Sequence, residues 1–215
     1  MARLVRVLTG APFTAAITFM SACARQPAPS TSPPVMPPSA VVDTRDGRSY
    51  KVVRIGTQRW LAQNARFATP RSRCYDDQQA HCERLGRLYD WQGSLTACPT
   101  GWHLATDDEW KALERVAGVP PDSLDGINAR GEGAGDRLKQ TGRLGFDAEL
   151  GGWFDPQQSQ FRRADTSSAI WTATESGPGR AWHRDVGNLR SSVWRSPVPV
   201  DFLLSARCVE RPRDD

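Results

Sequence analysis

The sequence lacks the short motifs that mark the commonest kinds of active site. It contains no Gly-x-Ser-x-Gly nucleophile elbow, no His-Glu-x-x-His metal motif and no glycine-rich phosphate-binding loop. These absences argue against the most readily recognised hydrolases, metalloproteases and nucleotide-binding enzymes. The sequence therefore predicts a protein that is not an enzyme and that uses no cofactor and no metal ion.

A strong or clustered positive charge is also absent. The formal net charge is only +4, and it includes Arg3 and Arg6, which lie in a segment that we expect to be removed. The other basic residues are scattered along the chain and form no basic helix or stripe. Because nucleic-acid-binding domains gather their basic residues on one face, we expect no nucleic-acid partner.

No hydrophobic run in the sequence is long enough to cross a membrane. Residues 7–20 are mostly apolar, but the run is short and is interrupted by polar, glycine and proline residues. Since two arginines precede it, the run predicts a secretory signal peptide over residues 1–22. It ends in Met20-Ser-Ala-Cys23, which is similar to the bacterial lipoprotein signal, in which the cysteine is lipidated and becomes the first mature residue. The alternative is an ordinary cleaved signal peptide followed by an incidental cysteine.

The segment that follows has the composition of a tether. Residues 23–40 begin with Cys23 and continue as a linker rich in proline and serine, which cannot bury a core and spans about 3 Å per residue when extended. Ala24 stands where an aspartate would disfavour export to an outer membrane. We therefore expect an exported protein that is anchored to the membrane through lipid on Cys23, and to the outer membrane if the cell has one.

The folded domain is predicted to comprise residues 41–212. All eight tryptophans lie between Trp60 and Trp194. Turn residues such as Asp46-Gly47 separate strand-like runs. The predicted strands are residues 41–42, 49–55, 58–62, 169–174, 181–186 and 205–209. Segments 74–82 and 122–135 are predicted to be loops. Short antiparallel strands at both ends of the chain, around one helix, indicate a loop-rich α+β domain.

The helix is predicted over residues 106–117 from its capping residues. Thr106 and Glu109 have the spacing of a capping box, in which each side chain bonds the backbone N–H of the other. Trp110 and Leu113 then recur at helical spacing and give the helix an apolar face. Trp102, in a short strand-like stretch just upstream, is expected to be structural, like Thr106, Glu109 and Trp110.

Four cysteines remain in the domain once Cys23 is set aside. In an exported protein they predict two disulfide bonds, for which three pairings exist. The favoured pairing joins Cys74 to Cys82 and Cys98 to Cys208. The competing interpretation is a zinc site formed by Cys74, His81, Cys82 and Cys98, which is disfavoured because adjacent residues are awkward shared ligands and because the cell exterior favours disulfides.

The order of the short motifs carries a family resemblance. They are Asp46-Gly-Arg-Ser-Tyr50, Ile55-Gly-Thr-Gln-Arg-Trp60, Cys74-Tyr, Gly86-Arg-Leu-Tyr89, Cys98-Pro-Thr-Gly-Trp-His-Leu104, Glu109-Trp110, Gly145-Phe-Asp-Ala148, Trp171-Thr-Ala-Thr-Glu175 and Ala206-Arg-Cys-Val209. Together they resemble the Fibrobacter succinogenes major paralogous domain over about residues 43–210. That family has no established activity and is common in exported and lipoprotein chains.

A more distant resemblance concerns the fold. Trp102-His-Leu-Ala-Thr-Asp-Asp-Glu-Trp110 is similar to the helix entry of the sulfatase-modifying, formylglycine-generating enzymes, which have a C-type-lectin-like fold. The resemblance implies that fold here. Those enzymes use two cysteines five residues apart, but the position five before Cys208 is Leu203. An enzyme of that type is therefore the disfavoured alternative. The calcium motifs of true C-type lectins are also absent, so calcium-dependent sugar binding is not expected.

What remains is a binding or structural module of the cell envelope, whose ligand is a glycan or a protein partner. Aromatic side chains on a loop-rich face grip sugars and extended peptides. The candidate ligand-binding residues are Trp153, Trp182, His183 and Trp194, whereas Trp171 is expected in the core. His103 is a weaker candidate, as a general base near Asp107 or Asp108; a structural role is favoured.

Overall fold

The computed structural model describes residues 40–211. The predicted signal peptide, Cys23 and nearly all of the linker lie outside the described residues, so the predictions made for them remain predictions. No helix among the described residues is long and apolar enough to cross a membrane.

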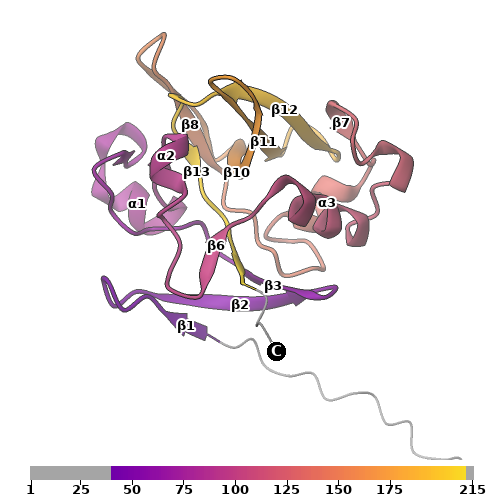
Figure 1. Ribbon diagram of the computed structural model, residues 1–215, viewed down its shortest axis with the longest axis horizontal. Coiled ribbons are helices and arrows are strands. Elements are labelled where there is room, and N and C mark those ends of the chain that lie inside the picture. The colour runs from indigo at the N-terminus through magenta and orange to yellow at the C-terminus, as the bar shows by residue number, and fades with distance from the viewer. Residues whose placement is uncertain (1–39, 212–215) are drawn as a thin grey trace, which may run out of the picture. The chain divides into compact units, whose positions relative to one another are not determined.

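The first and last strands of the domain share an antiparallel five-stranded sheet (Figure 1). In spatial order its strands are β1 (Ala40–Val42), β2 (Ser49–Ile55), β3 (Gln58–Leu61), β14 (Cys208–Glu210) and β6 (Trp102–Leu104). The turn at Asp46-Gly47 joins β1 to β2, and Gly56 lies in the turn before β3, as the sequence predicts.

A second, larger sheet is built mainly from the C-terminal half of the domain. Its strands, in spatial order, are β4 (Ser72–Arg73), β5 (Leu88–Tyr89), β13 (Leu204–Ser205), β10 (Ser167–Gly177), β11 (Arg180–Gly187), β12 (Val193–Pro199) and β7 (Asn128–Arg130). A hairpin of β8 (Gly151–Asp155) and β9 (Gln160–Ala164) joins it through β8, which pairs in parallel with β10. The protein is thus mixed and strand-rich.

The helices are short. They are η1 (Tyr75–Asp77), α1 (Gln79–Leu85), α2 (Trp91–Ser94), α3 (Asp107–Val116), η2 (Pro121–Ser123) and α4 (Ala134–Leu138). The predicted capping box begins α3: the Thr106 hydroxyl accepts from the Glu109 N–H at 3.2 Å, and the Glu109 carboxylate accepts from the Thr106 N–H at 2.8 Å. This box satisfies two of the backbone donors that a helix start leaves unpaired.

Helix α3 lies between the two sheets and anchors one of two cores (Figure 1). The rings of Trp60, Trp110 and Phe146 meet edge to face there, with centroids 5.4–5.5 Å apart. The second core contains Trp102 and Trp171, and the indole N–H of Trp171 donates to the Tyr89 carbonyl at 2.8 Å.

Both expected disulfide bonds are present. Cys74 bonds Cys82, and Cys98 bonds Cys208 across 110 residues, which ties the chain before β6 to the final strand. Because all four sulfurs are consumed, the alternative zinc site is wrong. Among residues 40–211, no group of three or more histidine, cysteine, aspartate or glutamate side chains is placed to hold a metal ion.

Several local predictions are corrected. Segment 74–82 is not simply a loop, because it holds η1 and the first half of α1. Segment 122–135 contains β7, and strands β8, β9 and β12 were not predicted from the sequence. In β12 the reason is compositional: Pro197 and Pro199 argue against a strand. They are accommodated because β7 pairs only with residues 193–195, so both prolines lie on a stretch that β7 does not cover.

Candidate functional site

The candidate site is the face of β10, β11 and β12 that points away from α3. Successive side chains of a strand point to opposite faces. On β11, Arg184 reaches carboxylates of α3, so His183 and Asp185 project from the other face. Trp194 is the register partner of Asp185 on β12, and it projects from this same face.

Two adjoining cavities, each of about 190 Å³, form a groove on this face. Trp153, His183 and Asp185 line both cavities. Arg163, Ser167, Arg190 and Trp194 are among the residues that close the polar end, and Ala169, Val198, Phe202 and Leu204 close the apolar end. We call this surface the β11 groove. The structure therefore brings together three of the four residues proposed from sequence: Trp153, His183 and Trp194.

The close approach of two strands positions Trp153. Gly152 has φ +65°, and a Cβ there would lie 2.3 Å from the carbonyl oxygen of Arg162 on β9. Gly152 also pairs with Ser168 of β10, which fixes the hairpin against the sheet. Only glycine suits this combination of backbone angle and contact. As a result, the partly buried indole of Trp153 forms one wall of the groove.

Two arginine–tryptophan pairs line the polar cavity. The guanidinium carbon of Arg190 lies 4.6 Å from the ring centroid of Trp194, and that of Arg163 lies 5.8 Å from Trp153. Both distances allow cation–π attraction. Among residues 40–211, neither guanidinium forms an ion pair with a carboxylate, so both charges remain available at the groove.

His183 presents a hydrogen-bond acceptor. Its Nδ1 lies 2.7 Å from the Ser196 carbonyl oxygen. Because a carbonyl can only accept, Nδ1 carries the proton and Nε2 is left with its lone pair. Burial lowers the pKa of His183 to about 4, helped by the charge of Arg184 and opposed by the bond to Ser196. The ring is therefore neutral at pH 7.

Asp185 adds a second acceptor. The Ser167 hydroxyl donates to one carboxylate oxygen at 2.6 Å, while no donor among the described residues bonds the other oxygen. Burial raises the pKa of Asp185, and the Ser167 bond and the charges of Arg190 and Arg163 oppose that shift. A polar ligand in the groove would thus meet two acceptors and two cationic donors.

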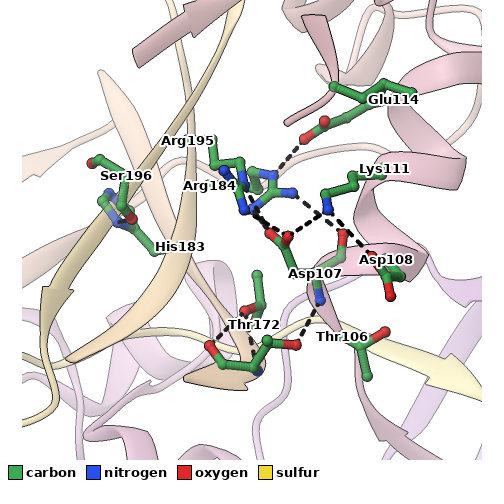
Figure 2. A network of polar contacts seen from close by, with 12 residues as sticks. Thr106, Asp107, Asp108, Lys111, Glu114, Thr172, His183, Arg184, Arg195 and Ser196 are labelled. Carbon is green, nitrogen blue, oxygen red and sulfur yellow. Dashed lines mark hydrogen bonds and ion pairs between the residues drawn. The ribbon is translucent and has the colours of Figure 1, made fainter. Parts of the chain in front are cut away.

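The opposite face of the same strands is filled by a buried ion network (Figure 2). Asp107 accepts from Arg184 at 2.8 Å and from Arg195 at 2.8 and 2.9 Å, and Glu114 bonds Arg130 at 2.7 Å and Arg184 at 2.5 Å. Burial alone would raise the pKa of Asp107, but the two arginines outweigh it and hold that pKa well below its usual range. In Figure 2, His183 and Ser196 lie apart from this network, away from α3.

Two candidates from the sequence lie elsewhere. Trp182 alternates with His183 on β11, and the Arg195 guanidinium lies 3.5 Å from its ring, on the side of the ion network. The structure therefore does not bring Trp182 to the groove. His103 bonds Glu109 at 2.9 Å, not Asp107 or Asp108, and so it joins the capping box of α3.

The sequence missed Arg163, Ser167, Asp185 and Arg190 as groove residues. Asp185 had a usable signal, since it lies two residues after His183 in a predicted strand and must share its face. Arg163 had none, because it follows a hairpin turn that the sequence did not predict, and it adopts a left-handed φ of +59°.

The fold and the site together define a disulfide-bonded, strand-rich α+β domain with an aromatic and basic groove on one sheet face. The family model described as the Fibrobacter succinogenes major domain matches residues 53–210, and the chain belongs to this family. The family resemblance carried by the sequence motifs is confirmed. No curated protein matches the chain, and no solved structure matches it. The C-type-lectin-like relation therefore stays a prediction.

Proposed function

We propose that the protein is an exported, lipid-anchored module of the cell envelope that binds a glycan in the β11 groove. The observation that carries the proposal is the convergence of Trp153 and Trp194 on a cavity that also holds unsatisfied polar groups. Indole rings give a flat apolar surface for one face of a pyranose, and polar groups at its edge give orientation. His183 and Asp185 supply acceptors for sugar hydroxyls.

The proposed anchor is lipid on Cys23, with the segment to Ala40 as a tether. At about 3 Å per residue when extended, that segment could hold the groove tens of ångströms from a lipid surface. Mass spectrometry of the membrane fraction tests the anchor directly. A lipid-modified Cys23 is expected, and a soluble, unmodified chain that begins at another residue would contradict it.

A glycan array probed with the mature chain, purified in detergent, tests the binding function. We expect binding to a defined subset of glycans, and loss of most of that binding in Trp153→Ala and Trp194→Ala. Ile127→Ala is the matched control, because it removes an exposed hydrophobic side chain outside the groove. Binding that survives both tryptophan changes would place the ligand elsewhere.

The resemblance of residues 102–110 to the helix entry of the sulfatase-modifying enzymes supports a C-type-lectin-like arrangement of the chain. It also leaves an enzyme of that type as the alternative function. That chemistry needs a reactive thiol, whereas the sulfur of Cys208 is buried and bonded to Cys98. Titration of free thiols in the folded, unreduced domain separates the two functions. The binding module is expected to have none, and a reactive thiol at Cys208 would restore the enzyme alternative.

A further inference from the structure

We propose that the polar end of the β11 groove selects a sugar that carries a carboxylate, such as a uronic acid residue of an acidic polysaccharide, and that Arg163 and Arg190 hold that carboxylate. This inference rests on the proposed glycan-binding function and goes further, because it names the chemical class of the ligand. It follows from the charges, the aromatic rings and the strand pairing around one cavity.

The first argument is charge. Most ion pairs of the described domain commit an arginine to a carboxylate, as in Arg66 with Glu149 and Arg84 with Asp165. Arg163 and Arg190 have no such partner among residues 40–211, and both lie close enough to Asp185 to influence its pKa. With two guanidinium groups against one carboxylate, the cavity carries a net positive charge. A planar guanidinium recognises a carboxylate through paired hydrogen bonds.

The second argument is the arrangement of rings and acceptors. Each of the two arginines lies beside a tryptophan, so a ligand that stacks on Trp153 or Trp194 would bring an acidic substituent within reach of a guanidinium. His183 Nε2 and the free oxygen of Asp185 accept hydrogen bonds, which requires donors on the ligand. A uronic acid combines an apolar ring face, hydroxyl donors and one carboxylate in a single residue.

The third argument disfavours an acidic peptide. Extended peptides commonly bind by adding a strand to a free sheet edge. The floor of the groove is β11, which pairs with β10 on one side and β12 on the other. The backbone N–H and C=O groups of β11 therefore already bond the two neighbouring strands. A ligand in the groove has to be recognised by side chains.

The experiment compares an oligogalacturonate with its methyl ester by calorimetry, using the mature chain purified in detergent. The two probes share the sugar ring and differ in charge. We expect the acid to bind at least about tenfold more tightly, the order of effect of one charged hydrogen bond at a partly exposed site. Arg163→Gln and Arg190→Gln should each weaken the acid about tenfold and leave the ester unchanged.

Arg54→Gln is the matched control, because Arg54 is exposed like Arg163 and lies outside the groove. Melting curves of all variants check that the fold is retained. Equal binding of acid and ester, or of a neutral oligosaccharide, would overturn the acidic specificity while the glycan-binding function stands. If a glutamate tetrapeptide bound and no glycan on the array did, both proposals would fail, and binding to no probe would also reject both.

Discussion

Arginine and aspartate side chains lie against both faces of the β10–β12 sheet, but they are paired on one face and not on the other. Toward α3, Arg184 and Arg195 are buried, and both bond the buried carboxylate of Asp107. Toward the groove, Arg163 and Arg190 have no carboxylate partner in the described domain, and Asp185 is bonded only by Ser167. Buried charges must be paired because desolvation is costly, whereas partly exposed charges can remain available. The paired face serves stability, and the unpaired face is the one suited to a ligand.

The largest expected effect comes from breaking the paired face. Asp107→Ala should lower the free energy of unfolding by about 3–5 kcal/mol, because it leaves Arg184 and Arg195 buried without their shared carboxylate. Chemical denaturation measures the change. Asp108→Ala is the matched control, since its carboxylate is the next along the chain and its side chain is 91% exposed. If both variants lost the same small amount of stability, the network would not be structural.

A somewhat smaller loss is expected from a backbone change on the groove face. Gly152→Ala should cost about 1–2 kcal/mol for its left-handed φ and a further 1–3 kcal/mol, roughly, for the contact of its Cβ with the Arg162 carbonyl. Gly47→Ala is the control that isolates the first cost, because Gly47 has φ +73° and open space around it. Gly152→Ala should also weaken glycan binding, because the same contact displaces Trp153. Equal losses in the two variants would mean that the hairpin tolerates the extra carbon.

Thr106→Ala is expected to cost about 0.5–2 kcal/mol, the usual worth of a helix cap. The change weakens the start of α3, next to Asp107, without touching the groove. The unfolding midpoint should therefore fall while glycan affinity stays constant. Thr100→Ala, an exposed threonine that begins no helix, provides the baseline. A parallel fall in affinity would show that the two faces are coupled.

The same contrast explains what the sequence could and could not predict. Helix α3 was predictable because Thr106 and Glu109 are local partners, three residues apart. The pairing of Arg184 with Asp107 was not, since it depends on a contact between residues 77 positions apart. The local sequence places Arg184 in a predicted strand and Arg190 outside it, but it does not show that Arg184 is buried against a distant carboxylate.

The groove itself was half predictable. Trp153, His183 and Trp194 stood out as aromatic groups near loops, and strand pairing then brought them together. Trp182 was proposed with them, although adjacent residues of a strand cannot share a face. Applying that alternation to the predicted strand 181–186 would have removed Trp182 and added Asp185. The position of Arg163 depends on the β8–β9 hairpin. That hairpin was not predicted, because glycine and charged residues interrupt the apolar pattern of its strands.

The smallest expected effect compares one carboxylate from each face across pH. The pKa of Asp107 is lowered, so its stabilising contribution is present above its ordinary value of 3.8 and is lost only as the pH falls through the lower folded value. The pKa of Asp185 is raised, so the sign is opposite: its contribution is full below 3.8 and is lost as the pH rises through the raised value.

Asp185→Asn should therefore be slightly more stable than the parent chain at pH 7, by about 0.5 kcal/mol or less, and this gain should vanish near pH 3. Chemical denaturation at a series of pH values measures this stability difference, with the exposed Asp201→Asn as control. A stability gain that persisted at pH 3 would show that the ionised Asp185 carboxylate is not what opposes folding at the groove.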